Sequence, residues 1–107
     1  MSETLQIVKG LVLAGKFRVS QHGDEEMRED GIFLTALLGS IDTAVLIEDY
    51  PGAWKGPTVL LLQEFEGKKF HAIWGLSKAT PDMASLVTAY VPDPHKWSVD
   101  FKTRLKP

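Results

Sequence analysis

The sequence predicts a single α+β domain, residues 1–107, in which two to three N-terminal helices pack on one face of a four-stranded antiparallel sheet. Two observations predict this fold class. Apolar residues recur at helical spacing as far as Gly39, and from Thr43 onward they alternate as they do in strands. Short connections containing glycine and proline separate the strand-like segments, which favours antiparallel pairing of neighbours.

The first helix is predicted to follow Ser2, whose hydroxyl can cap it. One apolar stripe comes next at helical spacing: Leu5, Val8, Leu11 and Val12. Gly15 is placed to end this helix as a left-handed cap. Residues 16–19 are then expected to form a short extended link.

A second helix is predicted over residues 21–30 and a third over residues 32–38. Ser20 is the expected N-cap of the second helix, whose acidic residues come early, where the helix dipole favours them. Gly31 ends the second helix and Gly39 ends the third. The apolar residues of the third predicted helix follow helical spacing least closely.

Four strands are predicted, over residues 43–50, 58–66, 69–76 and 84–91. Residues 66–68 form a tight turn, so the second and third strands make a hairpin. Pro92 and Pro94 end the fourth strand, because a proline nitrogen donates no hydrogen bond to a ladder.

Alternation along the third predicted strand divides its side chains between two faces. The set expected to face the helices is Phe70, Ala72, Trp74 and Leu76. His71 then lies on the opposite, more open face. Trp97 follows a proline-rich turn and is expected to anchor the C-terminal segment to the body of the domain.

The formal net charge of −2 does not favour broad electrostatic binding of nucleic acid. The charge is uneven, with an acidic cluster (Asp24, Glu25, Glu26, Glu29 and Asp30) and a basic C-terminal end (Lys96, Lys102, Arg104 and Lys106). We first interpret both the acidic cluster and the basic end as solvent-exposed surface.

The sequence also excludes several classes of site. The absence of cysteine excludes disulfides and a cysteine zinc site. No phosphate-binding loop, dinucleotide-binding glycine pattern, serine nucleophile elbow or calcium loop is present, so no large cofactor is expected. Neither a signal peptide nor an apolar run of membrane-spanning length is found, so we expect a cytoplasmic protein with no membrane partner.

Four pieces of the chain carry a family resemblance, in this order: Gly15–Ser20 followed by His22 and the acidic run to Ile32; Glu48–Pro51; Gly67–His71; and Tyr90–Pro94 with Lys96, Trp97 and residues 100–104. Together they resemble the bacterial family called domain of unknown function 4258, over nearly the whole chain. The resemblance implies a compact fold of helices followed by a sheet. It also implies a distant likeness to RelE-type toxins, where such a sheet cradles RNA, and so suggests RNA or an antitoxin-like protein as partner.

His22 and Glu26 are four residues apart and share one helix face. If that helix lies beside the hairpin, His71 joins them in one pocket. The two imidazoles would then act as base and acid in a metal-independent cleavage of RNA, with Tyr90 supporting a histidine or stacking on a base. The same His22, Glu26 and His71 set is an alternative metal site, although its spacing matches no known zinc motif.

Arg28, Lys69 or Arg104 is the candidate cation for a phosphate, although the acidic cluster counts against this. Trp54 lies in a loop of glycine and proline and is a candidate ligand or partner contact. The alternative function is a non-enzymatic protein-interaction domain, such as a homodimer formed through an exposed strand edge or the Trp54 loop.

Overall fold

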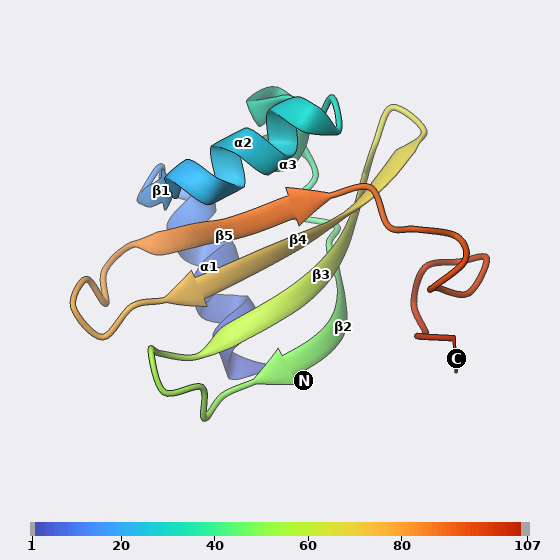
Figure 1. Ribbon diagram of the computed structural model, residues 1–107. Helices are drawn as coiled ribbons and strands as arrows, with labels where there is room; N and C mark the ends of the chain where they lie inside the picture. The colour runs from blue at the N-terminus through green and yellow to red at the C-terminus, as the bar shows by residue number, and fades with distance from the viewer. Residues whose placement is uncertain (1, 106–107) are drawn as a thin grey trace.

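The computed structural model describes residues 2–105 and contains three helices and a five-stranded mixed sheet (Figure 1). The elements are α1 (Glu3–Leu13), β1 (Phe17–Val19), α2 (Gln21–Glu29), α3 (Leu34–Gly39), β2 (Val45–Tyr50), β3 (Thr58–Phe65), β4 (Lys68–Leu76) and β5 (Ala84–Tyr90). The strand order is β1-β5-β4-β3-β2, and all pairs are antiparallel except β1 with β5. No helix within residues 2–105 has the length and apolarity needed to cross a bilayer.

The α+β prediction is confirmed, but the prediction of four antiparallel strands is wrong. The expected link before α2 contains β1, which pairs in parallel with β5 from Phe17 opposite Ala84 to Val19 opposite Leu86. Three residues are too few for a period of two to stand out in a sequence. The partner strand is also remote in the chain, so no hairpin turn points to the pairing.

Local capping fixes the helix ends close to where the sequence predicts them. The Ser2 hydroxyl accepts from Leu5 N, and the Ser20 hydroxyl accepts from Gly23 N at 2.9 Å. Gly31 has a φ of +66°, which lets the chain leave α2 in the left-handed region. The third helix begins later than predicted, because its N-cap Phe33 is extended.

All three helices pack on one face of the sheet around a single core (Figure 1). The predicted inward positions of β4 are confirmed there, and Trp74 is fully buried. Gln63 is the buried polar centre of this core: its side-chain amide receives the Trp74 indole N–H at 3.1 Å and donates to Leu37 O at 2.8 Å. These contacts satisfy groups that would otherwise be buried without a partner.

The other face of the sheet carries no helix, and we call it the helix-free face. Its two ends differ (Figure 1). The C-terminal segment (residues 92–105) lies at one end, near the starts of β4 and β2. The strand β1 and the β2–β3 and β4–β5 connections lie at the other end. This asymmetry determines where a ligand can reach the sheet.

Candidate functional site

His71 lies on the helix-free face, as the alternation in β4 predicts, but it is not open to solvent. Its exposed fraction is 0%. The Trp97 ring packs edge-on against the imidazole, with 4.4 Å between ring centroids, and Tyr90 packs beside it from β5. The C-terminal segment therefore closes over the one strand histidine of the predicted site. The expected anchoring role of Trp97 is confirmed, since its exposed fraction is 6%.

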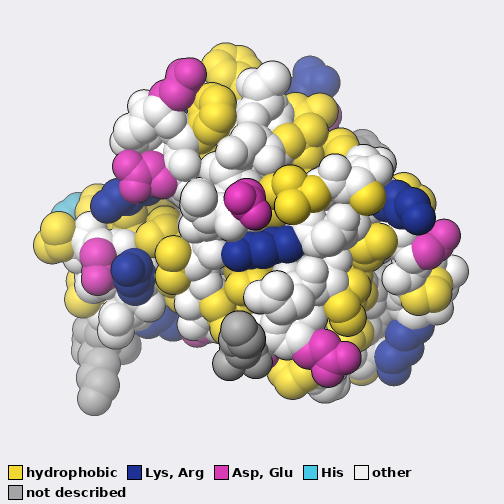
Figure 2. All heavy atoms as spheres, turned by 180° about the vertical axis from the view of Figure 1, so that it is seen from behind, with side chains coloured by type: hydrophobic (Ala, Val, Ile, Leu, Met, Phe, Trp, Pro, Cys, Tyr) yellow, Lys and Arg dark blue, Asp and Glu magenta, His cyan; other side chains and the backbone are white. Residues whose placement is uncertain are grey.

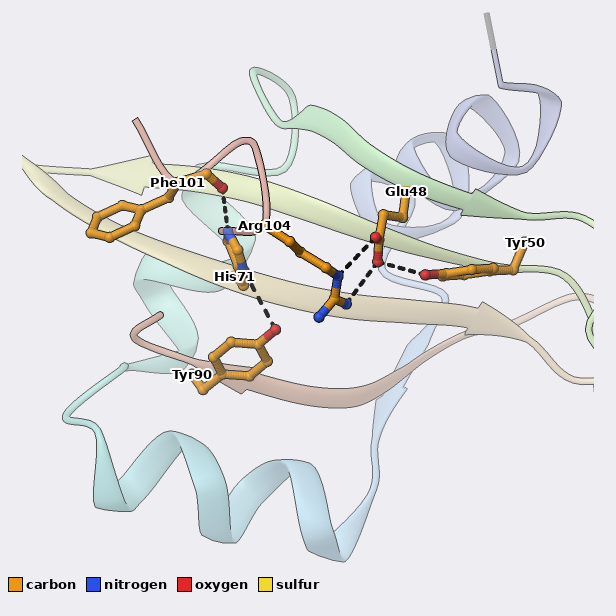
Figure 3. Close-up of polar contacts among 6 residues, drawn as sticks. All are labelled: Glu48, Tyr50, His71, Tyr90, Phe101 and Arg104. Atoms are coloured by element: carbon orange, nitrogen blue, oxygen red, sulfur yellow. Dashed lines mark hydrogen bonds and ion pairs between the residues drawn. The ribbon is translucent and has the colours of Figure 1, made fainter. Parts of the chain in front are cut away.

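Both ring nitrogens of His71 face a polar partner (Figure 3). Nε2 lies 2.7 Å from the Phe101 carbonyl oxygen, which can only accept, so Nε2 carries the proton. Nδ1 is then the acceptor for the Tyr90 hydroxyl at 3.4 Å. Burial lowers the pKa of His71 below its usual 6.5, against the opposing effect of the Phe101 carbonyl. The imidazole is neutral at pH 7 and holds the C-terminal segment in place.

A second polar group ties the same segment to β2. Arg104 donates from Nε to Glu48 Oε2 at 3.0 Å and from Nη2 to Oε1 at 2.9 Å. The Tyr50 hydroxyl also donates to Glu48, at 2.5 Å. The Arg104 guanidinium holds the pKa of Glu48 at about 2, below the usual 4.5, and the Tyr50 hydrogen bond acts in the same direction. The Arg104 guanidinium also lies 4.7 Å from the centre of the Trp97 ring.

The structure therefore brings His71, Tyr90 and Arg104 into one region of the helix-free face. Within residues 2–105, no hydrogen bond joins the Glu48–Arg104 pair directly to His71; the two groups meet through Trp97 and the backbone of the segment. Their shared effect is to fasten residues 92–105 to the sheet.

The prediction that His22 and His71 share one pocket is wrong. Along α2, Gly23 and Met27 face inward, and Gly23 lies against the backbone of β5. This turns the His22 side chain outward, where it is 66% exposed and its Nε2 lies 3.6 Å from Glu26 Oε1. His71 points away from the helices on the opposite face of the sheet. Within residues 2–105, no group of three His, Asp or Glu side chains is arranged to hold a metal ion, so this structure does not assemble the alternative metal site.

The remaining predicted binding residues are dispersed. Arg28 pairs with Asp24 on the exposed side of α2 at 3.0 Å. Lys69 lines a hollow of about 500 Å³ that also contains Lys102 and three carboxylates, from Glu64, Glu66 and Asp100. Those carboxylates make this hollow unsuitable for a phosphate. Trp54 is 80% exposed, with the Lys55 ammonium 5.3 Å from its ring centre.

The family model described as domain of unknown function (DUF4258) matches residues 19–91. The chain belongs to this family. The DUF4258 match runs from the end of β1 to just past β5, so it includes His71, Tyr90 and the Trp54 loop and excludes the C-terminal segment. No curated protein and no solved structure matches the chain significantly. The bacterial origin and the likeness to RelE-type toxins stay predictions.

The sequence did not point to several residues that the structure brings together on the helix-free face. Glu48 and Tyr50 are two apart on a strand, which places both on one face, and the basic C-terminal end offered an opposite charge. That combination was a usable signal for the Glu48–Arg104 pair. Arg18 and Ser85 were not candidates either; they are opposite each other only because β1 pairs with β5.

Proposed function

We propose that the protein is a small RNA-binding module that holds a single strand on the helix-free face of its sheet and does not cleave it. The end of this face under the C-terminal segment is closed by Trp97, Phe101 and Arg104. The other end is uncovered and is bordered by β1 and by the β2–β3 and β4–β5 connections (Figure 1). A strand would lie at this uncovered end.

One observation carries the proposal: an exposed aromatic ring lies beside one of the two cations that line the hollow at the uncovered end. The Trp54 ring is 80% exposed and carries the Lys55 ammonium beside it. Lys55 lines a surface hollow together with Arg18. Stacking on an aromatic side chain beside backbone-binding cations is the common way in which proteins hold single-stranded nucleic acid without reading its sequence.

The charges support local binding rather than a broad attraction. On the face that carries α1, basic and acidic side chains are interspersed (Figure 2). Two phosphate contacts, from Arg18 and Lys55, predict a shallow salt dependence, with a slope of about −1.4 in a plot of log K against log salt. Such a slope fits a chain whose net charge is −2.

Cleavage is not part of the proposal, because no acid–base pair is assembled. His71 is buried and both of its nitrogens already have partners. His22 is on another surface. General acid–base catalysis needs two groups within hydrogen-bond reach of one substrate, and these two imidazoles do not meet that requirement.

Replacing Trp54 by alanine is expected to weaken binding of a fluorescently labelled single-stranded RNA by about 5- to 150-fold, the loss of one stacked base. Fluorescence anisotropy at low salt measures the dissociation constant of each variant. Phe33→Ala is the matched control, because Phe33 is also strongly exposed, at 74%, but lies between α2 and α3. Equal affinities for wild type and Trp54→Ala would refute the proposal, and so would equal losses in the two variants.

A second candidate, a protein-interaction domain, is favoured by the surroundings of Phe33. Phe33 lines two hollows, of about 560 and 360 Å³. Both have a mixed lining, in which apolar side chains such as Phe65 and Phe70 in one and Val19 and Met27 in the other lie beside charged ones. Exposed apolar surface of this kind marks protein contacts. Light scattering at high concentration tests the homodimer version: a dimer lost in Phe33→Ser but kept in Trp54→Ala supports it, and a monomeric wild type contradicts it.

A further inference from the structure

We infer that the hollow at the uncovered end of the helix-free face, lined by Arg18, Lys55 and Ser85, is a phosphate-binding site. The inference rests on the proposed RNA-binding function and specifies the group that the site takes. The hollow has a volume of about 350 Å³, within the usual range of about 300–1,000 Å³ for small-ligand sites. We call it the Arg18 hollow.

The lining of the Arg18 hollow is selective for an anion. It contains two cations, Arg18 and Lys55, and the residues that line it include no carboxylate. Of its four hydroxyl groups, those of Ser20 and Thr58 already donate to backbone carbonyls, so Ser77 and Ser85 are the ones left within residues 2–105 to donate to an anion. Neither cation forms an ion pair within residues 2–105. The hollow beside Lys69, with its three carboxylates, shows the opposite character on the same face of the sheet.

Ser85 adds a second, independent observation. Its Oγ is buried and has no hydrogen-bond partner within residues 2–105. A buried hydroxyl without a partner is destabilising, and such groups in native proteins require an explanation. Ser85 lies opposite Arg18 in the β1–β5 ladder, so the hydroxyl and the guanidinium come from paired positions. A phosphate oxygen in the hollow would accept from the guanidinium and, once the Ser85 side chain rotates toward the hollow, from the hydroxyl.

The backbone is shaped to keep the hollow open and to bring Lys55 to it. Gly56 has a φ of +128°, and a Cβ there would lie 1.9 Å from the Leu76 carbonyl oxygen, so only glycine permits this loop to pack so closely on the end of β4. Gly75 lines the hollow without a side chain. Opposite Ile73 and Trp74, β5 carries an extra residue, Val87, which also lines the hollow, and bulges of this kind are common beside functional sites.

The site is tested by titrating the ¹⁵N-labelled full chain with inorganic phosphate, uridine 5′-monophosphate and a single-stranded RNA in turn. Saturable shifts are expected for the amides around the Arg18 hollow. Arg18→Gln and Lys55→Gln are each expected to weaken phosphate binding at least 5-fold. Arg28→Gln and Lys69→Gln, which remove the same charge elsewhere, are expected to leave the affinity unchanged.

Ser85→Ala separates a binding role from a structural one. It is expected to weaken phosphate binding by about 10- to 150-fold, the usual value of a hydrogen bond to a charged group, while leaving the thermal unfolding midpoint unchanged or higher. If wild type binds no phosphate, or if the Arg18 and Lys55 variants behave like their controls, the inference is wrong. RNA binding that depends on Trp54 but not on Arg18 would overturn this inference alone. Phosphate binding without any RNA binding would instead overturn the proposed function and leave an anion site.

Discussion

Replacing Trp97 by alanine is expected to lower the free energy of unfolding by about 3–5 kcal/mol, the usual cost of removing a buried tryptophan. Trp97 is 6% exposed and is the contact shared by both polar attachments of the C-terminal segment. Its ring packs on His71 and lies beneath the Arg104 guanidinium. Removal of the ring therefore exposes the imidazole and weakens the Arg104 attachment together. Urea denaturation monitored by circular dichroism measures the loss.

Trp54→Ala is the matched control for this experiment. It makes the same chemical change in a ring that is 80% exposed. Surface substitutions of this kind usually change stability by less than about 0.5 kcal/mol. Similar losses in the two variants would contradict the conclusion that the C-terminal segment is a packed part of the domain.

Lowering the pH from 7 to 5 is expected to destabilise the protein through His71. Burial lowers the pKa of His71 in the folded protein below the value of 6.5 expected after unfolding. The unfolded chain then binds the proton more readily, so the stabilisation is fully present above pH 6.5 and is lost as the pH falls. One such group contributes a slope of at most about 1.4 kcal/mol per pH unit. The nearby Arg104 charge lowers the pKa of His71 further, whereas Glu48 opposes this.

His71→Gln is expected to remove this part of the pH dependence. At pH 7 it should also cost about 1–3 kcal/mol, because a buried hydrogen-bonding group is left without its partner. His22→Gln is the matched control, since that side chain is 66% exposed. The measurement is a series of urea denaturations between pH 7 and pH 5. A wild-type slope that survives in His71→Gln, or that disappears in His22→Gln, would assign the titration to a different group.

The helices and the four meander strands could be predicted because each depends on local signals. Ser2 and Ser20 cap helices, glycines end them, and β4 alternates as its two faces require. The strand β1 could not be predicted in this way, because three residues carry no period and their partner strand is the last in the chain. Short motifs predict the family, and this is confirmed over residues 19–91, whereas the motif residues after Val91 lie outside the match.

The site was harder to predict than the fold. A spacing of four placed His22 and Glu26 on one helix face, and this is correct, but spacing does not say which way that face turns. Burial of Met27 decided the rotation of α2 and turned His22 away from the sheet. The burial of His71 depends on residues 92–105. Their path over the sheet is irregular, so no periodic pattern in the sequence predicts it. Arg18 and Ser85 depended on the missed parallel pairing.

The central claim is that the helix-free face is closed at His71 and open at the Arg18 hollow. Amide chemical shifts of the ¹⁵N-labelled protein, recorded during titration with a short single-stranded RNA, test this most directly. We predict that the largest shifts fall in β1, in the loop around Trp54, and at residues 75–77 and 85–87, with little change at His71 or at residues 97–104. The largest shifts at His71, Tyr90 and Arg104, with none around Arg18, would contradict the account.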